Sequence, residues 1–196
     1  MTICCNGELL DLSHPRVMGI LNCTPDSFYD GGKYWDPYEA FQQAGAMLKE
    51  GADFIDVGGY SSRPGAPDVS ETEELKRVLP VIEGLLAEFP EALISVDTFR
   101  SAVARAALDA GAAMVNDISA GLRDEKMLPL VAQRQVPYVM MHMRGTPRTM
   151  QHDTSYGDLL GEVVQTMSNG RPVPSLDCQA KGIPLKANPD RFSAIM

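Results

Sequence analysis

Polar side chains that could bind a ligand recur where apolar segments of the sequence end. In chain order they are Asn22, Asp56 with Gly58 and Gly59, Asp97, Asn116 with Asp117, and His142. Carboxylates accept hydrogen bonds and amides both donate and accept them, although either group alone could simply cap a helix. In a parallel barrel the carboxyl ends of all strands converge on one face, where barrel active sites lie. The pattern therefore predicts one shared site.

Two connections next to these residues have the composition of functional loops. Residues 24–32 (TPDSFYDGG) combine small polar side chains with a glycine pair and could fold over a ligand. Residues 58–74 (GGYSSRPGAPDVSETEE) form a long connection in which Arg63 is the only cation. Because long loops inside compact domains tend to be functional, we expect both connections to border the site.

The elements that must position these groups are five apolar runs separated by helical segments. The runs are RVMGILN (16–22), DFIDVGG (53–59), ALISVDT (92–98), AMVNDIS (113–119) and PYVMMHM (137–143). Strands that are apolar on both faces belong to a parallel sheet covered by helices. The repeated β, α order suits a doubly wound sheet or a (β/α)8 barrel, and periodicity alone does not choose between them.

Five helices are expected between and after these strands. Ser70 and Glu73 form a capping-box pattern at the start of one, and leucine, valine and isoleucine then repeat at helical spacing to residue 86. Another is predicted from near residue 36, with Pro37 in its first turn, to near Gly51. The others are expected after Thr98, after residue 124 and over about 157–169.

Composition limits the classes of partner. The 196 residues include 17 basic and 26 acidic side chains, and the net charge of -9 opposes general binding to nucleic acid or to an anionic membrane. We find no transmembrane run and no signal peptide, so we expect a cytoplasmic protein. The four cysteines lack metal-binding spacing and are interpreted as reduced thiols.

Five motifs together resemble dihydropteroate synthase, the folate-pathway enzyme that sulfonamides target. They are ILNCTPDSFYDGGKY, FIDVGGYSSRPGA, ISVDTFR, VNDIS and MMHMRGTPRTMQ, in this order over about residues 17–168. The resemblance implies a TIM (β/α)8-type barrel, present here as an incomplete barrel of about five βα units. It also implies that 6-hydroxymethyl-7,8-dihydropterin diphosphate is joined to 4-aminobenzoate with release of pyrophosphate.

The resemblance assigns roles to strand-end residues. Asn22 matches the position that contacts magnesium and the diphosphate, and an amide oxygen is a suitable hard ligand for Mg²⁺. Asp97 and Asn116 match residues that hold the pterin ring, whose amino group and ring nitrogens a carboxylate and an amide can read together. Magnesium is thus the cofactor that the resemblance implies.

Other roles fall on loops and on the last strand. Ser62 and Arg63 match the pair near the diphosphate and the aminobenzoate, Ser62 standing where the family commonly has threonine, and Arg63 is the predicted catalytic residue. Met141 matches an apolar wall of the pterin pocket, although a methionine in a strand is by default core filler. We expect His142 to make a local hydrogen bond and to have no role in acid-base chemistry.

The resemblance ends near residue 168. A full barrel has typically about 250 residues, whereas residues 169–196 contain four prolines and no convincing strand. We expect a pterin-binding part over 1–168, a divergent tail over 169–196, and a truncated, impaired form that is prone to dimerisation or self-association. The alternatives are a methyltetrahydrofolate-type methyltransferase, which lacks the TPDSF and SSRPG motifs, and a non-catalytic pterin-binding module.

Overall fold

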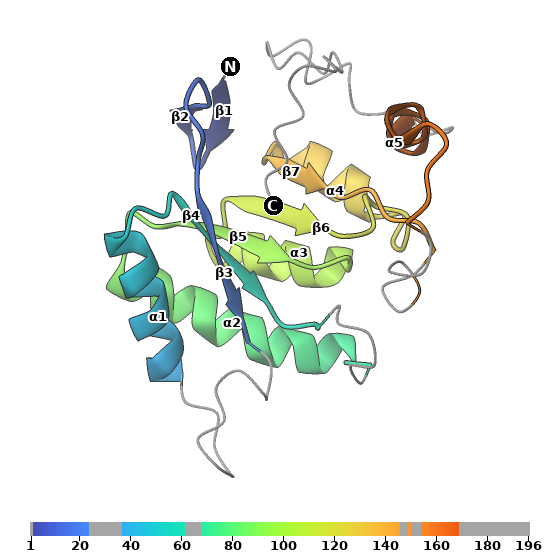
Figure 1. Cartoon of the computed structure of the whole chain (residues 1–196). Coiled ribbons are helices and arrows are strands. Elements are labelled where there is room, and N and C mark those ends of the chain that lie inside the picture. Colours follow the sequence, from blue (N-terminus) through green and yellow to red (C-terminus); the bar gives the residue numbers. More distant parts are fainter. Residues whose placement is uncertain (1, 24–36, 62–67, 146–148, 150–153, 169–196) are drawn as a thin grey trace.

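The described part of the chain is built around a five-stranded parallel sheet (Figure 1). The computed structural model describes residues 2–23, 37–61, 68–145, 149 and 154–168. The strands are β3 (Met18–Asn22), β4 (Phe54–Gly58), β5 (Leu93–Asp97), β6 (Met114–Asp117) and β7 (Tyr138–Met140). They pair in chain order, each parallel to the next. All five predicted strands are confirmed.

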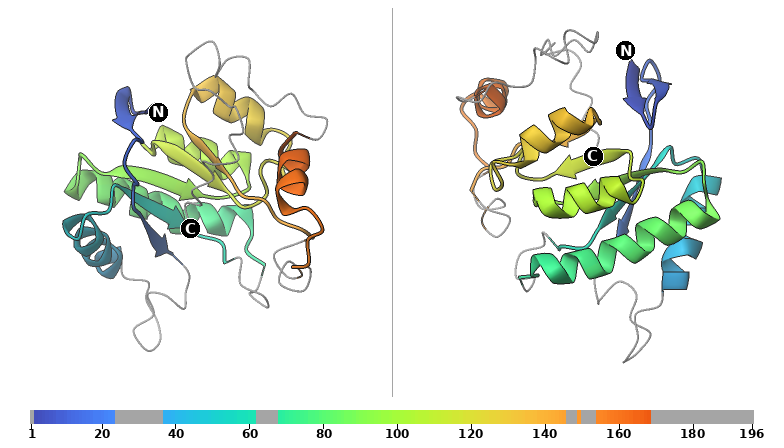
Figure 2. Two further views of the ribbon diagram at one scale, coloured as in Figure 1. Left: turned by 45° about the horizontal axis from the view of Figure 1, so that its top comes forward. Right: turned by 180° about the vertical axis from the view of Figure 1, so that it is seen from behind.

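Helices cover one face of this sheet. They are α1 (Pro37–Lys49), α2 (Glu71–Glu88), α3 (Ser101–Asp109) and α4 (Met127–Arg134), whereas the described residues of α5 (Leu159–Ser168) take no part in the core. The first four alternate with the strands, and the view from behind in Figure 2 shows α2 and α3 in front of the sheet. This is the arrangement that a repeated β, α order predicts for a parallel sheet.

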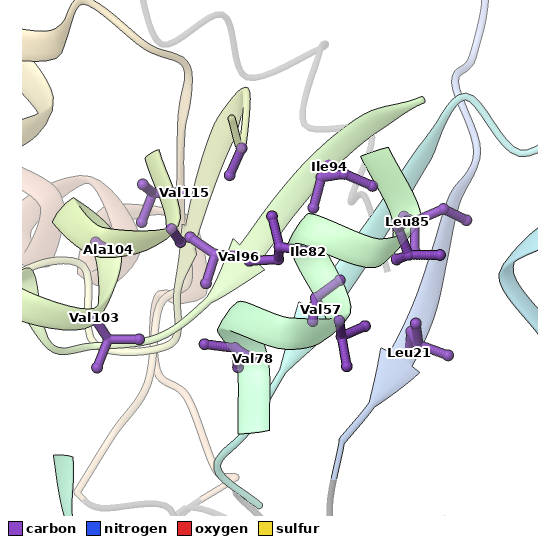
Figure 3. Close-up of a cluster of buried hydrophobic side chains, with 14 of the residues drawn as sticks. Leu21, Val57, Val78, Ile82, Leu85, Ile94, Val96, Val103, Ala104 and Val115 are labelled. Atoms are coloured by element: carbon purple, nitrogen blue, oxygen red, sulfur yellow. The ribbon is translucent and has the colours of Figure 1, made fainter. Parts of the chain in front are cut away.

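The core lies between the sheet and helices α1 to α4 (Figure 3). Val57, Val96 and Val115 are fully buried on this face, in one cluster with Val78 and Ile82 of α2. Because successive side chains of a strand point to opposite faces, the residues next to these valines point away from the helices. Packing of the apolar face therefore decides which polar side chains reach the other face.

Local signals begin and end the helices as predicted. The hydroxyl of Ser70 accepts a hydrogen bond from the backbone N–H of Glu73 at 3.2 Å, which caps α2. An N-cap of this kind is worth roughly 1 kcal/mol. Pro37 is the first residue of α1, and Gly51 follows that helix with φ of +103°, a conformation that favours glycine.

An N-terminal hairpin was not expected from the sequence. Strands β1 (Thr2–Cys5) and β2 (Glu8–Asp11) are antiparallel and joined by Asn6 and Gly7, both with positive φ. Buried Cys5 packs with Phe54 and Met114, the first residues of β4 and β6. The hairpin thus covers the amino ends of the strands, and the Asn-Gly pair is the hairpin signal that could have revealed it.

The sheet face away from the helices is unevenly exposed: Ile20 of β3 is 56% exposed, whereas Asp56 and Ser95 are buried. Within the described ranges, no helix is long and apolar enough to cross a membrane.

Candidate functional site

Strand register places the predicted site residues of three strands at one level of the sheet. Asn22 is paired with Gly58, Gly58 with Asp97, and Asp97 with Asn116. Each lies next to a buried core residue of its own strand, so all four share the face that the helices do not cover. The sheet therefore brings Asn22, Asp97 and Asn116 together at its carboxyl end, as the sequence predicted.

Gly58 leaves room between two of these side chains. A Cβ at this position would lie 3.4 Å from Oδ2 of Asp97 and 3.6 Å from Oδ1 of Asn22. Two oxygen atoms thus approach the same space from β3 and β5, on either side of β4, and a side chain at residue 58 would fill it. Such a space suits a ligand or ion that needs oxygen donors.

Asp56 lies one level deeper, beneath Asn116. Its register partners are Ile20 and Ser95, whereas the site residues belong to the next level of the same face. The side-chain Nδ2 of Asn116 donates a hydrogen bond to Oδ2 of Asp56 at 2.9 Å. Burial raises the pKa of Asp56, while the polar side chains of Ser95 and Asn116 oppose that rise.

Asp97 is in an acidic environment. Burial raises its pKa to about 8, and the negative charges of Asp56, Glu74 and Asp117 add to the rise. The group is therefore mostly protonated at neutral pH in the ligand-free chain, and a neutral carboxyl can donate as well as accept a hydrogen bond. Asp97 can consequently bind either a hydrogen-bond donor or a hydrogen-bond acceptor of a ligand.

Asp117, next to Asn116, has a structural task. Its carboxylate accepts hydrogen bonds from the backbone N–H groups of Ser119 (2.7 Å) and Gly121 (2.8 Å) and from the hydroxyl of Tyr138 (2.7 Å). These contacts shape the turn after β6, in which Ala120 has a positive φ. The sequence grouped Asp117 with Asn116, but the two side chains lie on opposite faces of β6.

A buried ion pair that the sequence did not reveal supports the end of β5. Glu74 of α2 is fully buried; it accepts a hydrogen bond from the hydroxyl of Thr98 at 2.6 Å and pairs with the guanidinium of Arg100. Arg100 also donates to the carbonyl of Val69 at 2.6 Å. Glu74 precedes Val78 by four residues, so helical spacing could have placed it on the buried face.

The same region holds the two ends of the connection that contains Ser62 and Arg63. The hydroxyl of Tyr60 donates to Oδ1 of Asp68 at 3.1 Å, across the connection, and the guanidinium of Arg100 lies over the Tyr60 ring. Ser62 and Arg63 themselves lie outside the described residues, as does the predicted lid over 24–32. Their roles stay predictions.

Two residues just after β7, Met141 and His142, bear on expectations from the sequence. Met141 is 37% exposed, so its side chain is not core filler, and its place in the wall of the pterin pocket stays a prediction. Both ring nitrogens of His142 are buried, and neither has a hydrogen-bond partner among the described residues. The expected local hydrogen bond of His142 is therefore missing there, and the ring stands 6.0 Å from that of Tyr156.

The oxygen donors at the site fit magnesium only if a bound diphosphate supplies further oxygen ligands to the ion. In the described ranges, no three His, Cys, Asp or Glu side chains are grouped to hold a metal. Asn22 and Asp97 offer hard oxygen atoms around the space beside Gly58. Because Mg²⁺ is usually bound by one or two protein oxygens together with substrate phosphates, this set suits an ion that arrives with a diphosphate.

The chain is similar in sequence to characterised enzymes. The family model described as pterin binding enzyme matches residues 18–183. A dihydropteroate synthase of Synechocystis sp. is 52% identical over 152 residues, and one of Escherichia coli is 47% identical over 163 residues. These alignments cover 78% and 83% of this chain but 52% and 57% of the relatives. The chain thus spans about half the length of the relatives it matches.

Solved structures show the same likeness in three dimensions. A Yersinia pestis dihydropteroate synthase in a sulfonamide drug complex is 43% identical, has a TM-score of 0.76, and is matched over 94% of this chain and 65% of its own. A Xanthomonas albilineans dihydropteroate synthase with 4-aminobenzoic acid is 45% identical with a TM-score of 0.72, over 84% and 57%. The prediction of an α/β fold with part of a (β/α)8-type barrel is confirmed. The extent of the family match shows that this chain belongs to the pterin-binding enzymes.

Proposed function

We propose that the chain carries the pterin-binding part of a dihydropteroate synthase. The reaction joins 6-hydroxymethyl-7,8-dihydropterin diphosphate to 4-aminobenzoate in folate biosynthesis. A carbon–oxygen bond to the diphosphate breaks, a carbon–nitrogen bond to the arylamine forms, and the amine loses a proton. The proposal includes the cytoplasm as the compartment and small molecules, with neither nucleic acid nor membrane, as the partners.

One observation supports this proposal most directly. Asn22 of β3, Asp97 of β5 and Asn116 of β6 lie at one level of the sheet, on the face that the helices do not cover. A pterin edge carries an amino group and ring nitrogens, and Asp97 and Asn116 offer the matching acceptors and donors. Asn22 is on the far side of Gly58 from Asn116, so a bound pterin could extend its diphosphate towards Asn22.

The site must also stabilise the negative charge of the leaving diphosphate. The charges that raise the pKa of Asp97 are those of Asp56, Glu74 and Asp117, all acidic. The nearby cation of Arg100 is paired with Glu74. Magnesium bound at Asn22 would supply positive charge to the departing diphosphate. Arg63, on the adjoining connection, would add a second cation, which is why we retain it as the proposed catalytic residue.

Binding of the pterin diphosphate tests the proposal. The chain should bind this compound in the presence of Mg²⁺, measured by calorimetry, and each of Asp97→Ala and Asn116→Ala should weaken binding by about 1–3 kcal/mol, the usual cost of an unsatisfied buried partner. Glu83→Ala, at an exposed position of α2, is the matched control and should bind like the unaltered chain.

Product formation separates an enzyme from a binding module. Pyrophosphate release should be followed after addition of 4-aminobenzoate. Binding without release would identify a pterin-binding module in place of a synthase. Absence of binding, or equal affinity in the Asp97 and Asn116 variants, would refute the proposed site.

A further inference from the structure

Asp56 is a buried acid that the proposed reaction does not use directly. It is 3% exposed and lies in the middle of β4, whose other residues are apolar or glycine. Its level of the sheet is below that of Asn22, Asp97 and Asn116. A ligand at the carboxyl end of the sheet therefore reaches Asn116 before Asp56, and a hydrogen bond links Asp56 to that residue.

The side chain of Asn116 forms this hydrogen bond. The Nδ2 atom of Asn116 donates to Oδ2 of Asp56 at 2.9 Å, between strands that are not neighbours in the sheet. Oδ2 of Asp56 is the acceptor in this hydrogen bond, and an acceptor matches the amide nitrogen of Asn116 but not its amide oxygen. The two ends of an asparagine amide have nearly the same shape, and a hydrogen-bond partner of fixed polarity is what distinguishes them.

The hydrogen bond to Asp56 uses one N–H group of Asn116 and so determines which donor and acceptor remain for a ligand. With one Nδ2 hydrogen directed to Asp56, a second N–H and the Oδ1 atom remain, in one spatial order. Rotation of the amide by half a turn would exchange donor and acceptor and leave Asp56 facing an oxygen. Asp56 thus discriminates between two amide orientations that packing alone would tolerate equally.

We infer that Asp56 is a positioning residue that holds the amide of Asn116 in one orientation and so sets the order of donor and acceptor presented to the pterin ring. This inference rests on the proposed function. It adds a determinant of ligand specificity that makes no contact with the ligand. The neighbouring Ser95 is an internal comparison, because it is buried at the same level and makes no hydrogen bond to Asn116.

Selectivity between two isomers tests the inference. Dissociation constants should be measured for pterin and for isopterin, in which the amino and oxo groups of the pyrimidine ring are exchanged. Asn116→Ala shows how much of the preference Asn116 provides. Asp56→Asn keeps the shape of residue 56 but accepts either amide orientation, so it should lower the preference for pterin about tenfold, the equivalent of one hydrogen bond. Ser95→Ala should leave the preference unchanged.

A ligand-independent measurement separates this inference from the proposed function. In a chain with nitrogen-15 in its asparagines, the side-chain amide hydrogens of Asn116, assigned by their loss in Asn116→Ser, should exchange slowly with solvent. They should exchange faster in Asp56→Asn, or in Asp56→Ser if the first variant does not fold. If the chain binds no pterin, the proposed function fails, and equal or unequal exchange still decides whether Asp56 holds Asn116.

Two results would overturn the inference. One is unchanged amide exchange of Asn116 in a folded Asp56 variant. The other is a pterin preference that Asp56→Asn leaves intact, whether or not Asn116→Ala reduces it.

Discussion

The stability of the folded chain should depend on the protonation of Asp97. Burial, with the charges of Asp56, Glu74 and Asp117, raises the pKa of this group from 3.8 to about 8. Between these values the folded chain keeps a proton that the unfolded chain has released. Because the unfolded state then binds fewer protons, the free energy of unfolding falls as the pH rises, and this loss is complete above about pH 8.

The size of this change in the free energy of unfolding follows from the one proton that the folded state retains. A difference of one bound proton changes the free energy of unfolding by about 1.4 kcal/mol per pH unit, which amounts to about 3 kcal/mol between pH 5 and pH 7. Asp97 keeps some contact with solvent, so this figure is an upper bound. Asp97→Asn cannot titrate, and its stability should therefore rise relative to the unaltered chain over the same interval.

Urea unfolding followed by circular dichroism at pH 5, 6 and 7 measures the effect. Asp11→Asn is a suitable control, because hydrogen bonds from Ser13 lower the pKa of Asp11 and place its titration below this interval. The control should keep the pH slope of the unaltered chain. Equal slopes in the unaltered chain and in Asp97→Asn would refute the argument that Asp97 is held neutral in the folded state.

Two further predictions concern packing and thiol chemistry. A Cβ at Gly59 would lie 2.8 Å from a side-chain atom of α2, so Gly59→Ala should lower the free energy of unfolding by about 1–3 kcal/mol. Gly58→Ala, with contacts of 3.4 Å or longer, should cost less stability and instead weaken diphosphate binding; similar urea midpoints for both variants would contradict this. Burial raises the pKa of Cys5 to about 11 and of Cys23 to about 12, so iodoacetamide at pH 8 should label exposed Cys4 and spare these two. Mass spectrometry that finds all three labelled at one rate would disprove it.

The sequence by itself determined the order of the strands and helices and the residues at the strand ends. Those features depend on local patterns, such as apolar runs for the strands and the Ser70 cap for α2. Asn22, Asp97 and Asn116 were predicted to share a site because parallel strands align their carboxyl ends, and the register confirms that they do. The roles that the family assigns to them stay predictions until binding is measured.

Only the tertiary structure decided how these side chains are supported. The hydrogen bond from Asn116 to Asp56 joins residues that are 60 positions apart, and Thr98 is 24 positions from Glu74. The acids look alike in sequence, yet Asp117 shapes a turn, Glu74 pairs with Arg100, and Asp97 lies on the sheet face that the helices do not cover. A single strand shows that its side chains alternate, but which alternate set meets helices depends on how distant segments pack. Long-range packing therefore assigned each acid its environment, and with it its charge and its task.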